Sequence, residues 1–583
     1  MRCSLTTILL LSSCLLQSCV GHGTAPEERL DAFCYNEPDG IGSLDPAVAS
    51  YQAAWWGTTH LFNGLVELDT ALQIVPCIAR SWDVDGRGLE WTFHLRSDIW
   101  FHEDPCFGAG MTRRLVAEDV RYSLERICDA RTKSTGLWAF RNLIVGADDY
   151  HQGTRHPAPG TQHHIEGIRV VDDSTLTITL TKPFAPFLAV LTMPYGSVVP
   201  REAVQMYGMD FGQHPVGTGP FRFDHWMQDV ECVLTRNPRY FKVDEEGKRL
   251  PYLQTVRITF LRDIKSEFLE FTRGTYDVVT QIDGSFAPSV YDVDLTLKPP
   301  YDKYVMHKAP AFSIEYYGVL LDTSFPAARA TPLATQRKVR QAMNLAIDRH
   351  RIVTYVLHGR GRPTRNGVLP PGMPGYSDTV RGYGYDPDKA RRLLAEAGFP
   401  NGKGCPPLLL QLGNNPRTAS VAEAIQEQWR ELGLNVELRQ IDFPQHLAQV
   451  RNGELALWRT SWIGDYPDPE NFLAVFTTQN TAPYGPNTTH ISRTDLDSLY
   501  NAALDPRLTN EQRYALYHRM EQIVIEESPW MFLYHDILIR LTHPNVKGFT
   551  LDGTGRLLLE RVYKTQDPRS RAQDPRPKTQ GTN

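Results

Sequence analysis

The stretch EAIQEQWRELGLNVEL, from Glu423 to Leu438, places a helix and a strand in one short segment. Ile425, Trp429 and Leu432 recur at the spacing of one helix face, Gly433 predicts the end of the helix, and a strand is expected from Leu434. Helices that alternate with strands are typical of α/β folds. The stretch therefore predicts α/β architecture.

Other segments show the same two periods. In YDPDKARRLLAEAGF, Asp386 predicts an N-cap, Pro387 the first helical position and Gly398 the end of the helix. A second helix is predicted in VRQAMNLAIDR by an apolar stripe of Val339, Ala342, Met343, Ala346 and Ile347. Strands are predicted where apolar and polar residues alternate: EWTFHLR (90–96), STLTITL (174–180) and TVRITF (255–260).

Length and charge limit the possible classes of protein. A chain of 583 residues exceeds the size at which one core stops growing, so we expect at least two lobes. Lys and Arg number 61 against 67 Asp and Glu, which gives a formal net charge of -6. The chain lacks the basic excess that binds phosphate backbones, so no nucleic acid partner is expected.

The N-terminus predicts export. Residues 5–16 form an apolar run that is too short to cross a bilayer and fits a signal peptide, residues 1–18. Leu16-Gln17-Ser18-Cys19 resembles the bacterial lipobox, which makes Cys19 the predicted lipidation site and residues 19–27 a tether. Cys14 ends a similar tetrad, and a plain secretory peptide is the alternative to both.

The remaining cysteines form no CxxC pair, so no metal cluster is predicted. They are Cys34, Cys77, Cys106, Cys128, Cys232 and Cys405. Disulfides and buried free thiols remain equal alternatives. The tail 564–583 has no apolar residues to bury and is predicted to be disordered.

No catalytic motif of a common hydrolase is present: the sequence contains no GxSxG elbow, no HExxH helix and no GxxxxGK[ST] loop. An exported hydrolase therefore stays a remote alternative without a nucleophile to name. We predict a protein that is not an enzyme and needs no cofactor.

A series of motifs resembles the family 5 extracellular solute-binding proteins, the peptide-type receptors of bacterial ABC importers. The match extends from about residue 31 to 562 and follows the family's order. It includes SLDPA (43–47), HLFNGLVELD (60–69), VAEDVRYSLER (116–126), HPVGTGPFRFDHW (214–226) and SWIGDYPDPENFL (461–473).

The resemblance implies a two-lobed receptor that closes on its ligand, with each lobe a mixed sheet flanked by helices. We expect lobe I to comprise residues 28–316 and 531–563, and lobe II residues 317–530. The two crossings are predicted near 316–321 and 530–534. The implied partners are a peptide, the permease of an ABC transporter and a bacterial membrane reached through Cys19, and the expected state is a monomer at the extracytoplasmic surface.

The resemblance also implies a ligand site. Asp465 is expected to bind the α-ammonium of a peptide, because a desolvated carboxylate without a partner favours a cationic ligand. Ser461, Trp462 and Ile463 are expected to pair with an extended peptide, opposite Ser50, Tyr51 and Gln52 on lobe I. Tyr466 is a further candidate lining residue.

Alternatives remain at each of these positions. Asp465 could be a turn residue or the partner of Arg459, and Asp468 before Pro469 is better explained as a turn former. Tyr51, Trp462 and Tyr466 could belong to the core.

The residue that would bind the C-terminal carboxylate of a peptide also has alternatives. Dipeptide-binding members place a carboxylate-binding Arg where this chain has Leu412, so longer peptides are favoured, with Arg417 as a possible substitute or a solvated helix residue. A metal chelate, haem or an oligosaccharide is the alternative ligand.

Overall fold

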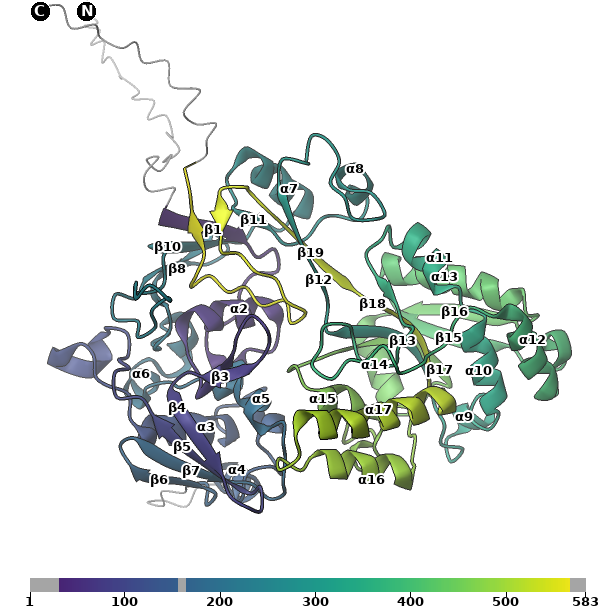
Figure 1. Ribbon diagram of the computed structural model, residues 1–583, viewed down its shortest axis with the longest axis horizontal. Helices are drawn as coiled ribbons and strands as arrows, with labels where there is room; N and C mark the ends of the chain where they lie inside the picture. The colour runs from purple at the N-terminus through teal and green to yellow at the C-terminus, as the bar shows by residue number, and fades with distance from the viewer. Residues whose placement is uncertain (1–30, 156–163, 567–583) are drawn as a thin grey trace, which may run out of the picture.

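The computed structural model describes residues 31–155 and 164–566, which form two lobes side by side (Figure 1). The predicted signal peptide and the Cys19 tether lie outside the described residues. Among the residues described, no helix is long and apolar enough to cross a membrane.

The first lobe contains two four-stranded sheets and one three-stranded sheet. The first is ordered β1 (Ala32–Asn36), β10 (Thr255–Thr259), β9 (Glu231–Arg236), β8 (Phe221–Met227). The second is ordered β4 (Ala79–Val84), β5 (Glu90–Leu95), β7 (Thr175–Thr179), β6 (Ile168–Asp172). The third is ordered β11 (Val278–Val279), β19 (Ile537–Thr542), β12 (Val305–Pro310).

Helices and short strand pairs complete this lobe. The helices are α2 (Gln52–Leu61), α3 (Ala117–Cys128), α4 (Ala147–Arg155), α5 (Phe187–Leu191), α6 (Arg201–Tyr207), α7 (Ile264–Arg273) and α8 (Ala287–Val290). The pairs are β2 (Val66–Leu68) with β3 (Ile74–Pro76) and β20 (Val546–Lys547) with β21 (Tyr563–Lys564). The alternation predicted for β5 is confirmed, because Trp91, Phe93 and Leu95 are buried.

The second lobe is built on one six-stranded mixed sheet. Its order is β14 (Arg362–Pro363), β18 (Trp530–His535), β13 (Ser313–Val319), β17 (Leu457–Ile463), β15 (Leu408–Gly413), β16 (Val436–Ile441). Its helices are α9 (Pro326–Arg329), α10 (Arg337–Leu345), α11 (Arg349–Arg351), α12 (Pro387–Glu396), α13 (Pro416–Arg430), α14 (Phe443–Arg451), α15 (Pro469–Leu473), α16 (Thr494–Ala503) and α17 (Asn510–Glu527).

The helices predicted for this lobe are confirmed. All five residues of the predicted stripe that starts at Val339 are buried. Asp386 caps α12 by accepting a hydrogen bond from the Lys389 amide. Trp429 of α13 is fully buried against the sheet, and Gly433 has the positive φ of 84° that ends a helix.

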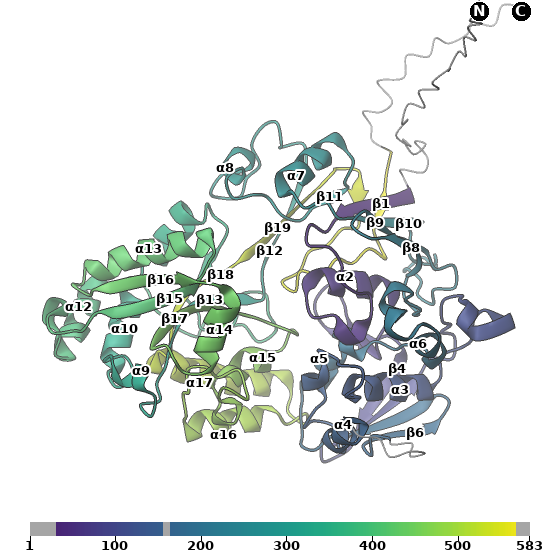
Figure 2. The ribbon, with the colours of Figure 1, turned by 180° about the vertical axis from the view of Figure 1, so that it is seen from behind.

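The chain passes between the lobes twice (Figures 1 and 2). It leaves β12 of the first lobe through Ala311 and Phe312 to enter β13, and it returns from β18 to β19 through Asp536. The predicted crossing segments 316–321 and 530–534 overlap β13 and β18, in the interior of the second sheet. The chain thus crosses just before the first predicted segment, where β13 starts, and just after the second, where β18 ends.

Two further expectations are resolved. The six cysteines of the described chain are free thiols, so the disulfide alternative is wrong. Lys564, placed by prediction at the start of the disordered tail, belongs to β21 and forms an ion pair of 2.9 Å with Asp277. Residues 567–583 lie outside the described chain.

The Phe312 peptide is bonded to segments on both sides of the first crossing. Its N–H donates to Gly553 O (2.7 Å) in the return segment of the first lobe, and its C=O accepts from the Gly464 amide (2.8 Å) at the end of β17. The crossing residue thus links the end of β17 to the first lobe.

Gly553→Ala is expected to destabilise the protein by about 1–3 kcal/mol, because a methyl group there overlaps the Phe312 ring and lies 2.7 Å from Pro310 O. Urea denaturation measures the change. Gly86→Ala is the control, since nothing lies within 4 Å of its added carbon. Equal stability of the two variants would contradict tight packing at the crossing.

Candidate functional site

One edge of β17 is open at its carboxyl end. β17 pairs with β13 from Leu457 to Ile463, but with β15 only at Leu457 and Trp458. The hydrogen bond from Gly464 to Phe312 fixes the ladder so that the Trp462 peptide groups face β13. The peptide groups of Ser461 and Ile463 therefore face the open edge, as a strand that adds a ligand requires.

The His446 side chain occupies one carbonyl of this edge. Its Nε2–H donates to Arg459 O (2.8 Å), the carbonyl next along the same side of β17. The open part of the edge thus begins at Ser461. Directly beyond it, Gly464 and Asp465 turn the chain toward α15.

The Asp465 carboxylate lies beside the open edge without a cationic partner among the described residues. Its Oδ2 accepts from Asn471 Nδ2 (3.2 Å), and the same Asn471 accepts through Oδ1 from the Asp465 amide and the Trp462 indole, both at 3.2 Å. Burial raises the pKa of Asp465 above its ordinary value of 3.8. A cationic group of a ligand would reverse this shift.

Asp465 is neither the partner of Arg459 nor the turn former of this segment, because other acids have those positions. Arg459 forms an ion pair with Glu315 of the adjacent strand and not with Asp465. Asp468 caps α15 by accepting from the Glu470 amide (2.9 Å) and forms a buried ion pair with Arg513 (2.9 Å). Its expected role at a turn is therefore observed, together with a partner that the sequence did not indicate.

A cavity of about 500 Å³ adjoins Asp465 and is lined from both lobes. Trp462, Asp465 and Asn471 line it from the second lobe, and Trp138 and Phe184 from the first. The lobes touch beside it, where the Ala185 amide donates to Leu504 O (2.7 Å). This volume lies in the range of small-molecule sites.

Tyr466 belongs more to the core than to the cavity, because only 6% of it is exposed. Its hydroxyl and that of Tyr500 both donate to the buried Glu470 carboxylate. Trp462 is half-buried with its ring on the cavity, and Ile463 is 68% exposed. Of the aromatic candidates in this segment, Trp462 is the one placed to contact a ligand.

The lobe I candidates do not form a strand. Gln52 is the first residue of α2 and Tyr51 is its N-cap, with Tyr51 O accepting from the Trp55 amide (3.0 Å). Ser50, Tyr51 and Gln52 are exposed, and none of them lines the cavity at Asp465. The first turn of α2 uses the Tyr51 carbonyl, so the segment predicted to pair with a peptide on lobe I does not offer it a strand edge.

The sequence did not indicate Tyr195 of the first lobe. Burial raises its pKa, and the negative charge of Asp465 in the second lobe acts in the same direction. The Tyr195 hydroxyl contacts Thr135 Oγ1 at 3.1 Å, and its ring packs against Trp138. No short-range pattern links these residues to Asp465.

Arg417, the possible carboxylate ligand, lies at the start of α13. It forms an ion pair with Asp536, the residue of the return crossing, and its guanidinium lies 5.8 Å from the centre of the Tyr534 ring. The described chain holds no cluster of His, Cys, Asp and Glu that could bind a metal ion.

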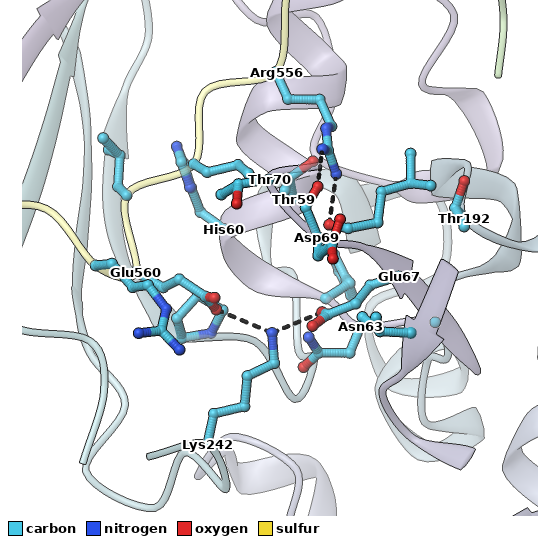
Figure 3. Close-up of a pocket in the computed structure, with 18 of the residues that line it drawn as sticks. Thr59, His60, Asn63, Glu67, Asp69, Thr70, Thr192, Lys242, Arg556 and Glu560 are labelled. Atoms are coloured by element: carbon cyan, nitrogen blue, oxygen red, sulfur yellow. Dashed lines mark hydrogen bonds and ion pairs between the residues drawn. The ribbon is translucent and has the colours of Figure 1, made fainter. Parts of the chain in front are cut away.

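A second cavity, of about 530 Å³, lies within the first lobe (Figure 3). Lys242 donates there to Glu67 (2.6 Å) and Glu560 (3.1 Å), and Arg556 donates to the carbonyls of Leu68 and Asp69. These bonds join β2 to the return segment of the chain. The cavity shares no lining residue with the one at Asp465.

Comparison with known proteins identifies relatives along nearly the whole chain. Residues 73–484 match the model of the bacterial extracellular solute-binding proteins, family 5 middle. The chain is 29% identical over 558 residues to heme-binding protein A of Haemophilus influenzae, covering 93% of this chain and 94% of that protein. It is 27% identical over 523 residues to the dipeptide-binding protein of Escherichia coli, covering 87% and 90%.

Solved structures show the same fold. The unliganded open form of the periplasmic murein tripeptide-binding protein MppA superposes with a TM-score of 0.74 at 22% identity, covering 92% of this chain and 98% of that one. The two-lobed α/β architecture predicted from the sequence is thereby confirmed.

Asp465→Asn is expected to raise the thermal stability of the empty protein at pH 7. The folded carboxyl has a raised pKa, so its ionisation removes stability as the pH rises above 3.8, and an amide avoids this loss. The gain should shrink as the pH falls toward 3.8, which melting curves at several pH values measure.

Asp468→Asn is the matched control, because it breaks the buried pair with Arg513 and should destabilise the protein by about 3–5 kcal/mol. A loss of stability at pH 7 in Asp465→Asn would contradict an unpaired carboxylate at that position.

Proposed function

Because the chain belongs to the family 5 bacterial extracellular solute-binding proteins, we propose that it captures peptides between its lobes and delivers them to the permease of an ABC importer. The proposed ligand is a short peptide with a free N-terminus. The protein would act as a monomeric receptor outside the cytoplasm and would release the ligand without chemical change.

The observation that carries this proposal is the unpaired Asp465 carboxylate at the end of an open strand edge. A peptide that added to this edge would exchange backbone hydrogen bonds with Ser461 and Ile463 and present its ammonium group to Asp465. An ion pair formed in a desolvated site contributes more than one in water. Backbone pairing is independent of side chains, so tolerance of many peptide sequences is expected.

Trp462 and the cavity of about 500 Å³ support a place for the first side chain of the peptide. The lining includes aromatic and aliphatic residues of both lobes, so closure would enclose that side chain on two sides. Phe312 would transmit closure, since its peptide group bonds to Gly464 beside Asp465 and to Gly553 of the first lobe.

Haem is the second candidate ligand, because one relative is a heme-binding protein. The residues that line the cavity include no His, Cys or Met, and the hydroxyls of its two tyrosines, Tyr466 and Tyr500, both donate to Glu470. This lining favours a peptide.

Peptides with a free amine should raise the melting temperature of the mature protein, and N-acetylated forms of the same peptides should not. At 100 times the Kd, binding adds about 2.7 kcal/mol to the stability of the folded state. Asp465→Asn should abolish the difference between free and acetylated peptides. Ser461→Ala is the control, because it keeps the strand backbone and should retain the preference for a free amine.

An absence of any shift with peptides, in protein first unfolded and refolded to remove bound ligand, would contradict the peptide proposal. A shift with haem under the same conditions would favour the second candidate.

The proposal includes a lipid anchor at Cys19, supported by the lipobox-like Leu16-Gln17-Ser18-Cys19. Cys19→Ala should release the protein from the membrane fraction, whereas Cys14→Ala should leave it bound. Intact mass of the membrane-extracted protein checks for the acyl chains. Release by Cys14→Ala alone would move the anchor to the earlier cysteine.

A further inference from the structure

A cavity of about 280 Å³ lies at the edge of the six-stranded sheet, where β14 pairs with β18. Its polar lining consists of His350, Arg362, Arg365, Asn366, Tyr376 and His535. It shares no residue with the cavity at Asp465, which adjoins β17 on the far side of β18 and β13. No Asp or Glu lines it, so its walls are cationic.

The arginines of this cavity have no carboxylate in direct contact among the described residues. Arg362 and Arg365 form no ion pair with a described residue, and the sequence has no Asp or Glu between Asp348 and Asp378. Two carboxylates in the surroundings accept hydrogen bonds from neutral groups and not from these arginines. Asp378 accepts from the Tyr376 hydroxyl (2.8 Å), and Glu521 accepts from the amides of Val368 and Leu369.

The backbone holds the two arginines in place. Arg362 lies opposite His535 in the antiparallel ladder, so the two side chains extend from the same face, with Cβ atoms about 5 Å apart. The Thr364 amide donates to Leu533 O, and Arg365 O accepts from the Gly382 amide (2.8 Å). These backbone bonds fix the positions from which two exposed arginine side chains line one cavity.

His535 adds a hydrogen-bond acceptor among these donors. Its Nδ1–H donates to Ser313 O (2.8 Å), which leaves Nε2 without a hydrogen in the neutral ring. Burial lowers the pKa of His535 to about 4, so the ring is neutral at pH 7. Nε2 makes no hydrogen bond to a described residue and can accept one from a ligand.

The lining therefore suits an anion that also carries a hydrogen on oxygen. Hydrogen phosphate and a singly protonated phosphomonoester have both features, whereas sulfate and simple carboxylates are fully deprotonated at neutral pH and offer no donor to Nε2. We propose that the cavity formed by Arg362, Arg365 and His535 binds a phosphate group, either as inorganic phosphate or as a phosphomonoester.

The test compares inorganic phosphate, sulfate and glycerol phosphate at pH 6 and equal ionic strength, with the melting temperature and isothermal titration of the mature protein as readouts. Phosphate is expected to bind at least about tenfold more tightly than sulfate. Tighter binding of glycerol phosphate than of inorganic phosphate identifies a phosphomonoester as the ligand, and weaker binding identifies the free anion.

The double substitution Arg362→Met and Arg365→Met should abolish phosphate binding, while Arg351→Met, an exposed arginine of the same stretch that does not line the cavity, should not. His535→Asn keeps a donor for Ser313 and lacks an acceptor at the position of Nε2, so it should lower the preference for phosphate over sulfate. Near-UV circular dichroism checks that each variant is folded.

Equal affinity for sulfate and phosphate, or no binding of either, would overturn the proposal. Retention of phosphate binding in the double variant would overturn it as well. Peptide binding at Asp465 is measured separately, so either outcome leaves the proposal for that site unaffected.

Discussion

The hydrogen bonds of one peptide group, that of Phe312, set the relation between the lobes. Its N–H is bonded to Gly553 and its C=O to Gly464, so the segment that carries Asp465 starts directly beside the crossing between the lobes. Both partners are glycines whose added methyl group would collide with an aromatic ring. Rotation about this crossing therefore moves the carboxylate and the open end of β17 together, as one body with the second lobe.

Burial of the Asp465 carboxylate without a cationic partner costs stability, and a cationic ligand would offset that cost. A half-buried carboxylate held only by Asn471 is less stable than one in water, and the structure maintains it because Asn471 also fixes Trp462 and the Asp465 amide. Two other buried acids of the second lobe have cationic partners. Glu315 has Arg459, and Asp468 has Arg513. Asp465 differs from these two acids because it has no cationic partner among the described residues, and this difference is the ground for its proposed binding role.

Local sequence predicted much of the fold and part of the site. Periodicity and end signals identified α10, α12, α13, β5, β7 and β10, because helix faces and strand alternation are properties of neighbouring residues. The partners of Arg459, Asp468 and Arg417 were not predictable, since each pair joins residues distant in the chain. Ser50 to Gln52 were expected beside a peptide strand, but the capping of α2 by Tyr51 depends on how the whole lobe packs. The influence of Asp465 on the pKa of Tyr195 was not predictable either, because the two residues belong to different lobes.

The hydrogen bond between His446 and Arg459 gives the open edge a fixed length. From Ser461 to Ile463, where the strand ends, it rises by about 7 Å at about 3.3 Å per residue, so the open edge presents the peptide groups of two residues. The open edge is thus bounded by the His446 ring on one side and the Asp465 carboxylate on the other. Under the proposed function, such an edge would recognise a short stretch of main chain next to a free amine, whatever side chains follow.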